Sequence, residues 1–397
     1  MHKRKDINAI LLAIYLWMFI VLRIVWAFNS NYSTIILGII SILIICVSII
    51  NSEKFINITF LKGIIIFSSV IFFLLIDMLF RNNEILNVRL YEFLIYGVIP
   101  ILLLSQIRNF GEFFKTYVIF SVIVFFVYVL DPINQYFLSS SYMVYGFQAM
   151  LPAFMGLHIG RKEFGLKPLI ILEIMAFIMM LFFGNRMAGI AALIFVILID
   201  LLYKRRSAKK NIKYFFFICL VITIIMNIQP IAEKAANILN NNGYSSYSIN
   251  SIIFYLNGTI DSLSSGRNIL WENAIDLIKE NPIIGYGVGY YESMFNIYVH
   301  NFFLEITLSY GLLGIFTYML MLFYSCYRII KNDDKLKLFG ILLFCTSFPK
   351  LFTSHFIFEE PTFWMFIFYG VYSVSISFER NGKIGYRKRV TLNDNAN

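Results

Sequence analysis

Four ionisable residues have side chains that could bind and activate a phosphorylated substrate. One is a histidine, His300, and three are arginines, Arg89, Arg186 and Arg267. Histidine titrates near neutral pH without special tuning, so it can act as a general base. Arginine presents a planar fork of donors that binds phosphate oxygens in a bidentate manner. These residue types predict a site for an anionic head group carried on a lipid tail.

Each of these residues also has a simpler structural explanation. His300 could mark the end of a membrane helix, and Arg186 could reach the lipid head groups. Arg89 could form ion pairs with Glu84 and Glu92, which flank it in the sequence. Both kinds of explanation stay open at this level.

The other histidines are weaker candidates for a base. His355 follows the eleventh predicted span beside Glu359 and Glu360, and this acidic neighbourhood makes it the rival of His300. His2 and His158 are predicted to lie on the opposite side of the membrane, away from such a substrate.

The elements that must position these residues are membrane helices. Hydrophobic residues make up 59% of the 397 residues and charged residues only 14%, whereas a soluble domain carries about 25% charged residues. We find about twelve apolar runs of the length that spans a bilayer. They centre on 8–28, 33–50, 59–80, 87–104, 113–130, 144–159, 168–184, 187–203, 213–229, 300–327, 336–353 and 361–378. The fold class predicted is an all-α, polytopic helical membrane protein, with the sixth run broken or tilted.

The distribution of basic residues orients this bundle. Most Lys and Arg fall in the two termini and in the even-numbered loops, which share one side of the membrane. Cationic loops stay in the cytoplasm, so we expect both termini to be cytoplasmic. The net charge of +10 is then explained by topology and by attraction to membrane lipid, and predicts no nucleic-acid partner.

One long external loop, residues 230–299, interrupts the series of short loops, and such an insertion is where function is expected. "QPIAEKAANILNN" and "SSGRNILWENAIDLIKENP" in this loop each carry an apolar stripe and predict two amphipathic helices. Ser265 could cap the second helix, Asn281-Pro282 would end it, and Arg267 would lie in its first turn.

Three glycines follow the second helix, at Gly285, Gly287 and Gly289. A dinucleotide-binding loop would need a further glycine three residues after the second one, where the chain has Tyr290. We expect tight backbone turns that return the chain to the bundle. In a continuous helix, His300 and Gly311 would lie within about 20° of one face, against which a helix or a lipid chain could pack.

Two stretches of the sequence resemble a known family. "SGRNILWENAIDLIKENPIIGYGVG" followed by "HNFFLEITLSYGLLG" resembles the signature of the superfamily of O-antigen ligases and O-antigen and capsular polysaccharide polymerases. The "GNRMAGIAAL" turn is similar to the family's arginine-bearing helix start, although Asn185 stands where the family often has Ser. The motifs cover about 184–192 and 265–314, and the predicted architecture agrees over residues 1–397, which we expect to form a single polytopic membrane domain.

The resemblance implies a glycosyltransferase in the cytoplasmic (inner) membrane of a bacterium, acting on its outer face. Its substrates would be oligosaccharides linked to undecaprenyl diphosphate, and a chain-length regulator and a flippase are candidate partners. His300 would be the catalytic base for the acceptor hydroxyl, and Arg186 and Arg267, with Arg89, would bind the diphosphate. Because arginines hold the leaving group, and no cysteine or Asp-x-Asp spacing suggests a metal site, we expect no metal and no cofactor.

Three functions fit the sequence. We favour a polymerase of lipid-linked repeat units of O-antigen, capsule or exopolysaccharide. A ligase of the same family would transfer a finished glycan, for example in lipopolysaccharide synthesis. A flippase or secondary transporter would be expected to show repeat symmetry and charges at the membrane midplane. The chain shows no such repeat, and Asp77, Glu173 and Asp200 lie near the ends of their spans.

Overall fold

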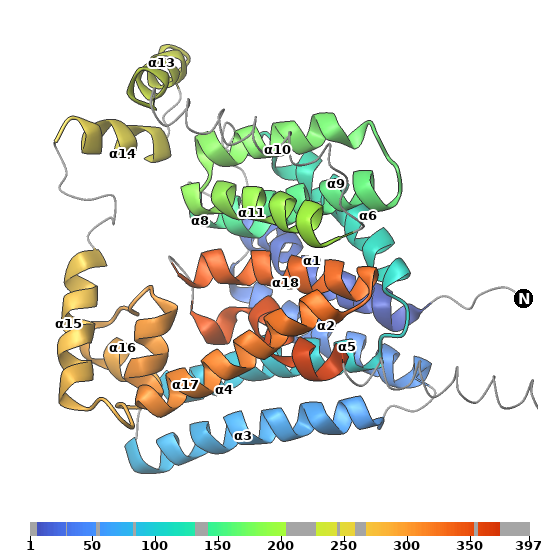
Figure 1. Cartoon of the computed structure of the whole chain (residues 1–397), viewed down its shortest axis with the longest axis vertical. Helices are drawn as coiled ribbons and strands as arrows, with labels where there is room; N and C mark the ends of the chain where they lie inside the picture. The colour runs from blue at the N-terminus through green and yellow to red at the C-terminus, as the bar shows by residue number, and fades with distance from the viewer. Residues whose placement is uncertain are drawn as a thin grey trace, which may run out of the picture.

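The chain is helical wherever the structure describes it. The computed structural model describes residues 6–28, 30–52, 56–81, 85–131, 142–203, 228–243, 247–258, 267–352 and 356–373. Within these ranges every regular element is a helix (Figure 1). An apolar chain in a bilayer folds in this way because a helix satisfies its own backbone hydrogen bonds. The all-α prediction is confirmed for this part of the chain.

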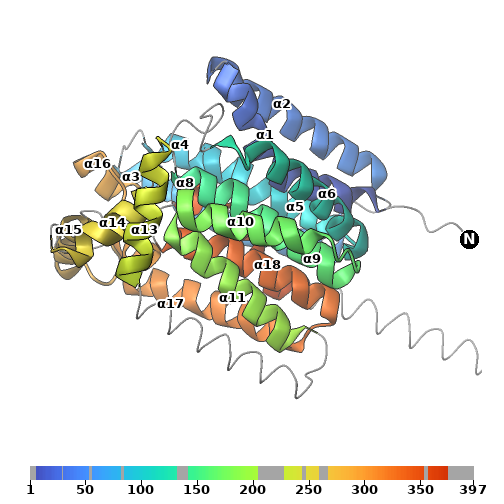
Figure 2. The same cartoon turned by 90° about the horizontal axis from the view of Figure 1, so that it is seen from above.

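The first half of the chain forms helices that run back and forth along one bundle (Figures 1 and 2). They are α1 (Ile7–Phe28), α2 (Ser30–Asn51), α3 (Ile58–Arg81), α4 (Ile85–Glu92), η1 (Phe93–Val98), α5 (Ile99–Gln106), α6 (Phe110–Tyr128), α8 (Tyr142–Val144), η2 (Tyr145–Met150), α9 (Leu151–Glu163), α10 (Leu169–Phe183) and α11 (Arg186–Leu202). Two continuous helical segments contain a π-helical turn: η1 joins α4 to α5, and η2 joins α8 to α9. The sixth predicted run is therefore interrupted, as its short length suggested.

The second half leaves the bundle at one end and then returns to it. Helices α13 (Ile228–Asn241), α14 (Tyr247–Leu256), α15 (Arg267–Glu280) and α16 (Tyr290–Phe295) gather at the left of Figure 1. The bundle is resumed by α17 (Phe302–Lys331), α18 (Asp334–Leu351), the short turn η3 (Ile357–Glu359) and a helix over 361–373. Most of the predicted loop 230–299 is thus ordered helix, and its residues 244–246 and 259–266 lie outside the described ranges.

Three helical segments among the described residues are long and apolar enough to cross a membrane. They are Ile85–Gln106, Phe110–Tyr128 and Phe302–Lys331, with 22, 19 and 30 residues. Most of the predicted ninth run, 213–229, falls outside the described ranges. The structure therefore supports a membrane protein, while the count of about twelve spans stays a prediction.

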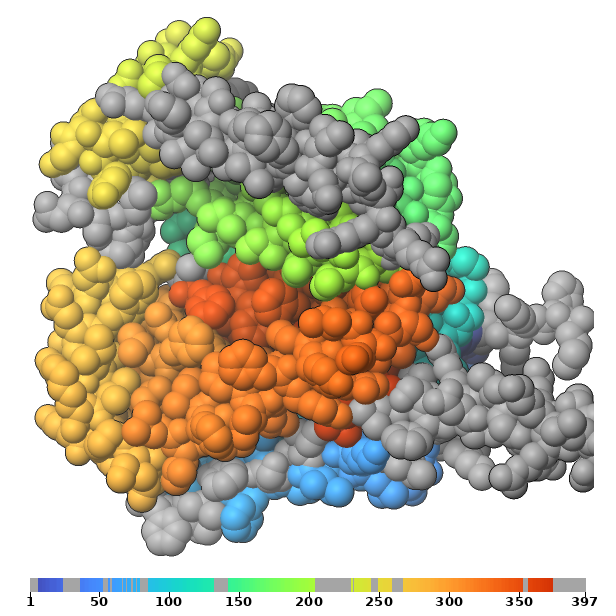
Figure 3. Space-filling model, viewed as in Figure 1, coloured from blue at the N-terminus to red at the C-terminus, as the bar shows by residue number. Residues whose placement is uncertain are grey.

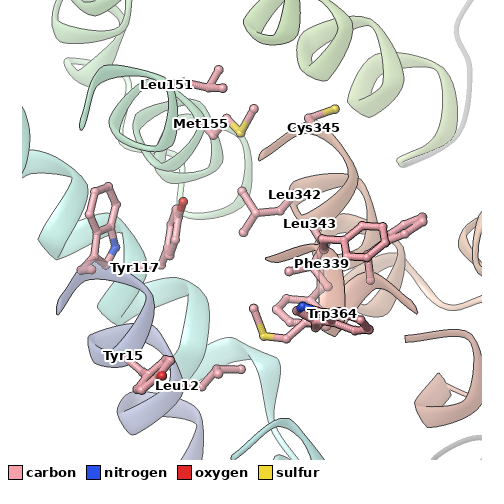
Figure 4. Close-up of a cluster of buried hydrophobic side chains, with 14 of the residues drawn as sticks. Leu12, Tyr15, Tyr117, Leu151, Met155, Phe339, Leu342, Leu343, Cys345 and Trp364 are labelled. Atoms are coloured by element: carbon pink, nitrogen blue, oxygen red, sulfur yellow. The ribbon is translucent and has the colours of Figure 1, made fainter. Parts of the chain in front are cut away.

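An aromatic core joins helices that are far apart in the sequence. Trp17 of α1 lies against Tyr117 of α6, with ring centroids 5.0 Å apart. Phe113 of α6 meets Phe339 of α18 edge to face at 5.1 Å. Figure 4 shows Tyr117, Phe339 and Trp364 around this shared core. Such pairs contribute packing and a preferred ring geometry, and they fix α1, α6 and α18 around the same centre.

Both predicted amphipathic helices of the long loop are present. In α15, Ala274 is fully buried and Leu277 and Ile278 pack beside it, as the apolar stripe predicted. The helix ends at Glu280, directly before Asn281-Pro282. In α13 the predicted stripe was Ile231, Ala235, Ile238 and Leu239. The buried residues are Ala232 and Ala236, and Ala235 and Leu239 pack beside them. The predicted cap, Ser265, lies outside the described residues.

Candidate active site

Helix α15 holds the segment that leads into α17. The Trp271 indole nitrogen donates a hydrogen bond to the Val299 carbonyl oxygen at 3.1 Å. The Tyr291 hydroxyl donates to the Leu270 carbonyl oxygen at 3.0 Å. Ala274, Tyr291 and Val299 share a small apolar cluster, and α15 and the start of α17 form one continuous surface in Figure 3. The loop helices therefore fix the residues just before α17, which include His300.

His300 lies in this segment, two residues before the first residue of α17. Its backbone is left-handed, with φ of 58°, a conformation that non-glycine residues seldom adopt outside special sites. Its ring centroid lies 4.0 Å from that of Tyr298. Its Nδ1 is buried and has no hydrogen-bond partner within the described residues. A buried ring nitrogen without a partner costs about 1–3 kcal/mol, so its position is explained better by function than by stability.

The surroundings of His300 change its titration. Burial, together with the positive charge of Arg267, lowers the pKa of His300 to about 4. The sequence-based expectation of a pKa near neutrality took no account of burial and is wrong. The imidazole is neutral at physiological pH and can accept a proton, although this pKa makes it a weaker base than a histidine that titrates near neutrality.

Arg267 is a cation whose charge acts on this imidazole. It is the first residue of α15, as predicted, and is partly exposed. Its charge acts on both His300 and Tyr298. In the part of the chain that the structure describes, Arg267 forms no ion pair. A cation left unpaired beside a neutral base is well placed to bind an anionic ligand.

Arg89 has the opposite environment. Its guanidinium is buried and pairs with Glu92 at 2.5 Å, with Glu292 at 2.5 Å and with Glu359 at 3.4 Å. It also lies over the Phe356 ring, 4.0 Å from the ring centroid. Pairing with Glu92 is the simpler explanation that the sequence allowed. The other two partners join α4 to α16 and to η3, so Arg89 ties three segments together.

A buried carboxylate, Glu305, lies in the first turn of α17 near this cluster. Only 8% of its surface is exposed. It is within electrostatic range of Arg89 and Glu292 and lies beside the Val299 backbone. The site therefore combines one imidazole, two arginines and several carboxylates at a single end of the bundle.

The glycine-rich segment forms backbone hydrogen bonds with α17 at the point where that helix is interrupted. Helix α17 is interrupted at Gly311, whose φ of 64° and ψ of −163° are not helical. Gly285, Gly287 and Gly289 all have positive φ, as the predicted turns require. Four backbone hydrogen bonds join the two segments: Tyr286 N to Leu308 O (2.6 Å), Gly287 N to Ser309 O (2.9 Å), Leu312 N to Pro282 O (2.8 Å) and Leu313 N to Ile283 O (3.4 Å). The loop thus satisfies groups that the broken helix leaves free.

This geometry corrects the predicted small-residue face. His300 is not part of α17, and the helix does not run regularly past Gly311. A Cβ atom at Gly311 would come within 2.1 Å of the Ile283 carbonyl oxygen. Gly311 is therefore needed for contact between two backbones, and the idea that His300 and Gly311 share a helical face is wrong.

Arg186 begins α11 at the same end of the bundle as α15 and α16 (Figures 1 and 2). The Asn185 side chain caps this helix by accepting a hydrogen bond from the Met187 backbone at 2.8 Å. Asparagine and serine are both favoured N-cap residues, so Asn185 can cap this helix as the serine of the family motif would. The part of Arg186 in the site stays a prediction.

Of the remaining histidines, one lies within the described residues. His158 is buried between α9 and α10, where its Nδ1 lies 2.7 Å from Glu173. His2 and the rival base His355 lie outside the described residues.

Sequence reasoning missed four groups that surround His300 and Arg89. They are Tyr298, Glu292, Glu305 and Glu359. Burial and the negative charge of Glu359 raise the pKa of Tyr298 to about 12, so its hydroxyl keeps its proton. Only Glu305 carried a sequence signal, because a carboxylate inside an apolar helix is expensive and usually functional.

The comparisons with known proteins concern this same region. The family model for O-antigen ligase matches residues 171–319. The match runs from α10 into α17 and includes Arg186, Arg267 and His300, but not Arg89. A comparison with curated proteins found no match.

Proposed function

Because the chain belongs to the superfamily of O-antigen ligases and polymerases, we propose that it polymerises lipid-linked oligosaccharide repeat units. Members of this family are glycosyltransferase-like membrane enzymes of polysaccharide biosynthesis. We place the reaction on the outer face of the bacterial inner membrane, with both termini cytoplasmic and about twelve spans. The glycan carrier we propose is undecaprenyl diphosphate.

The proposed reaction is a direct displacement at the anomeric carbon. A hydroxyl oxygen of the acceptor sugar bonds to the anomeric carbon of the donor glycan, and the bond from that carbon to the diphosphate oxygen breaks. The hydroxyl proton passes to the neutral imidazole of His300. The growing chain is transferred to the new repeat unit, lipid diphosphate leaves, and the anomeric configuration inverts.

Arg267 and Arg186 are the groups we assign to the leaving diphosphate. Negative charge builds up on its oxygens as the bond breaks, and fixed cations in a dry site stabilise that charge. Arg267 suits this role because it has no carboxylate partner among the described residues and lies beside His300. This pairing of a free arginine with a neutral histidine is the observation that carries the proposal.

Arg89 receives a different role from the one predicted. Its three carboxylate partners offset its charge, so a phosphate would have to displace them. We assign it to positioning α16 and η3 around His300.

The polymerase assignment is tested on surface polysaccharide from a deletion strain. Loss of the ladder with single repeat units retained on the acceptor supports a polymerase. Loss of all attached glycan while lipid-linked polymer accumulates would make the protein a ligase, which uses the same chemistry with a finished glycan as donor.

Substituting Arg267→Lys is expected to lower activity while membrane abundance stays normal. Lysine keeps the charge but loses the bidentate fork, and loss of one transition-state donor costs about 10²- to 10³-fold in rate. We expect the same direction for Arg186→Lys. The measurement is polymer formed per unit of protein.

A control for charge alone comes from the same helix. Lys279 is exposed at the end of α15 and pairs with the exposed Asp276 at 2.8 Å, so Lys279→Gln is expected to leave the ladder unchanged. If Arg267→Lys and Arg186→Lys both gave wild-type ladders, a positive charge alone would be sufficient and the bidentate role would be wrong.

A further inference from the structure

A second space, lined by apolar and polar side chains, lies in the bundle and shares Glu359 with the cluster around Arg89. It is a cavity of about 330 Å³ between α1, the two π-helical turns, α18 and the segment 359–362. Cavities of this size hold small molecules or single sugar-sized groups. Figure 4 shows part of its wall, where Tyr117 of α6 and Leu342 of α18 face each other. The proposed reaction has so far used none of these residues.

Two cations and two carboxylates line this cavity. Lys350 pairs with Glu360, and Glu359 pairs with Arg89. Arg23 of α1 donates from its Nε to the Gln148 side-chain oxygen at 3.3 Å and lies within electrostatic range of Glu359. Among the described residues it forms no ion pair. An arginine within an apolar helix is costly unless it faces a cavity and has a partner or a function.

The π-helical turns η1 and η2 both border this cavity. Tyr96 belongs to the π-helical turn η1, and Phe147 and Gln148 belong to the π-helical turn η2. The Tyr15 hydroxyl bonds the carbonyl oxygen of Ile95 in η1 at 2.5 Å. Single π-helical turns inside long helices are rare and are common at functional sites. Here they turn a tyrosine and a glutamine toward one polar space.

The lining suits a sugar better than a lipid chain. Trp17, Tyr96 and Tyr117 supply aromatic faces that sugar rings pack against, and Gln148, Thr346 and Thr362 supply hydrogen-bonding groups. The Trp17 indole nitrogen is buried and has no hydrogen-bond partner in the described part of the chain. A pocket for an acyl chain would need none of these polar groups.

We propose that this cavity binds one sugar unit of the acceptor glycan, with Arg23 holding an anionic group on it. The anion is a carboxylate of an acidic sugar or a phosphate of the lipid carrier, since a guanidinium binds both in the same bidentate way. Glu359 lines the cavity and also pairs with Arg89, so the bound unit lies next to the segments around His300. This inference rests on the proposed glycosyl transfer.

The test is ligand binding by the full-length protein in neutral-lipid nanodiscs, followed by tryptophan fluorescence. The probes are glucuronate, glucose and inorganic pyrophosphate, and Trp17→Phe identifies the part of the signal that comes from the cavity. We expect glucuronate to bind and Arg23→Gln to weaken it about tenfold or more, because a charge-assisted contact is lost. His300→Ala should bind glucuronate like the wild type.

The outcomes distinguish a sugar carboxylate from a phosphate of the lipid carrier, and the cavity assignment from the proposed function. Tighter, Arg23-dependent binding of pyrophosphate would assign the anion to the lipid carrier and overturn the sugar as its source. Equal binding of glucose and glucuronate, or no effect of Arg23→Gln, would overturn the inference. If His300→Ala removes the polymer ladder while Arg23→Gln alters neither ladder nor binding, the cavity assignment fails and the proposed function stands. Thermal unfolding of Arg23→Gln at or above the wild-type temperature excludes a folding defect.

Discussion

Replacing His300 with alanine is expected to abolish visible polymer while the protein remains in the membrane at normal abundance. Removal of a general base costs about 10²- to 10⁴-fold in rate, and a ladder of repeats disappears when each addition is slowed that much. The measurement is the glycan ladder of a deletion strain that expresses each variant at matched level.

The controls separate the base from the backbone that carries it. His300 has positive φ, so His300→Asn is the better-tolerated change, because asparagine accepts this conformation and cannot take up the proton. Asn296 has a φ of 55° in the same segment and an exposed side chain. Asn296→Ala therefore tests the backbone cost alone and should keep the ladder. His355→Ala is expected to have a milder effect.

A wild-type ladder from His300→Ala would transfer the role to His355 or remove the general base from the mechanism. A lost ladder from Asn296→Ala as well would mean that the segment, rather than the imidazole, is what matters.

The pH dependence gives a second readout of the same residue. Burial and Arg267 lower the pKa of His300 to about 4, so the imidazole is neutral at any pH well above that value. We expect activity to fall on the acid side only as pH approaches about 4, rather than near the unperturbed value of about 6.5. Arg267→Gln removes one of the two causes and should move this acid limb to higher pH. An acid limb near pH 6.5 in the wild type would contradict the buried environment of His300.

The local parts of this site could be predicted from the sequence. The apolar stripe and Asn281-Pro282 predicted α15, and with it the place of Arg267 at the start of that helix. The positive φ values of the loop glycines were also expected. These features depend on neighbours within one or two helical turns, where spacing and propensity decide the conformation.

The long-range parts could not be predicted. Arg89 meets Glu292 and Glu359 across more than 200 residues of sequence, and no local pattern marks such partners. The lowered pKa of His300 depends on burial created by packing. The break at Gly311 depends on a loop that arrives from elsewhere in the fold, so an apolar stretch with two glycines was expected to be a regular helix.

This break leads to the second large effect: Gly311→Ala is expected to destabilise the protein and to remove activity. The Gly311 backbone, at φ 64° and ψ −163°, lies in a region that is essentially open to glycine alone, and residues forced into such regions cost about 1–3 kcal/mol. The new Cβ would also lie 2.1 Å from the Ile283 carbonyl oxygen. Because the clash is between backbone atoms, which cannot move without breaking their hydrogen bonds, we expect the loop to separate from α17.

Loss of this contact should reach the site because the loop leads directly to it. The Val288 backbone amide donates to the Asp77 carboxylate at 3.0 Å, and Glu292 of α16 pairs with Arg89. A displaced loop would shift α16 and the segment that carries His300. The variant should therefore unfold at lower temperature and give no polymer ladder, even though Gly311 touches no reacting atom.

Two further substitutions make the test specific. Gly285→Ala disrupts the same contact on the loop side, because its Cβ would lie 2.6 Å from the Gly311 backbone nitrogen. This variant should behave like Gly311→Ala. Gly38 lies in α2 with nothing within 4 Å of its added Cβ, so Gly38→Ala should unfold at or slightly above the wild-type temperature, because alanine favours the helix by about 0.5–1 kcal/mol. Thermal unfolding of the purified variants and their glycan ladders are the measurements. If Gly311→Ala matched Gly38→Ala in both, the paired backbones of the loop and α17 would not be needed, and the transmembrane segment could run as a regular helix.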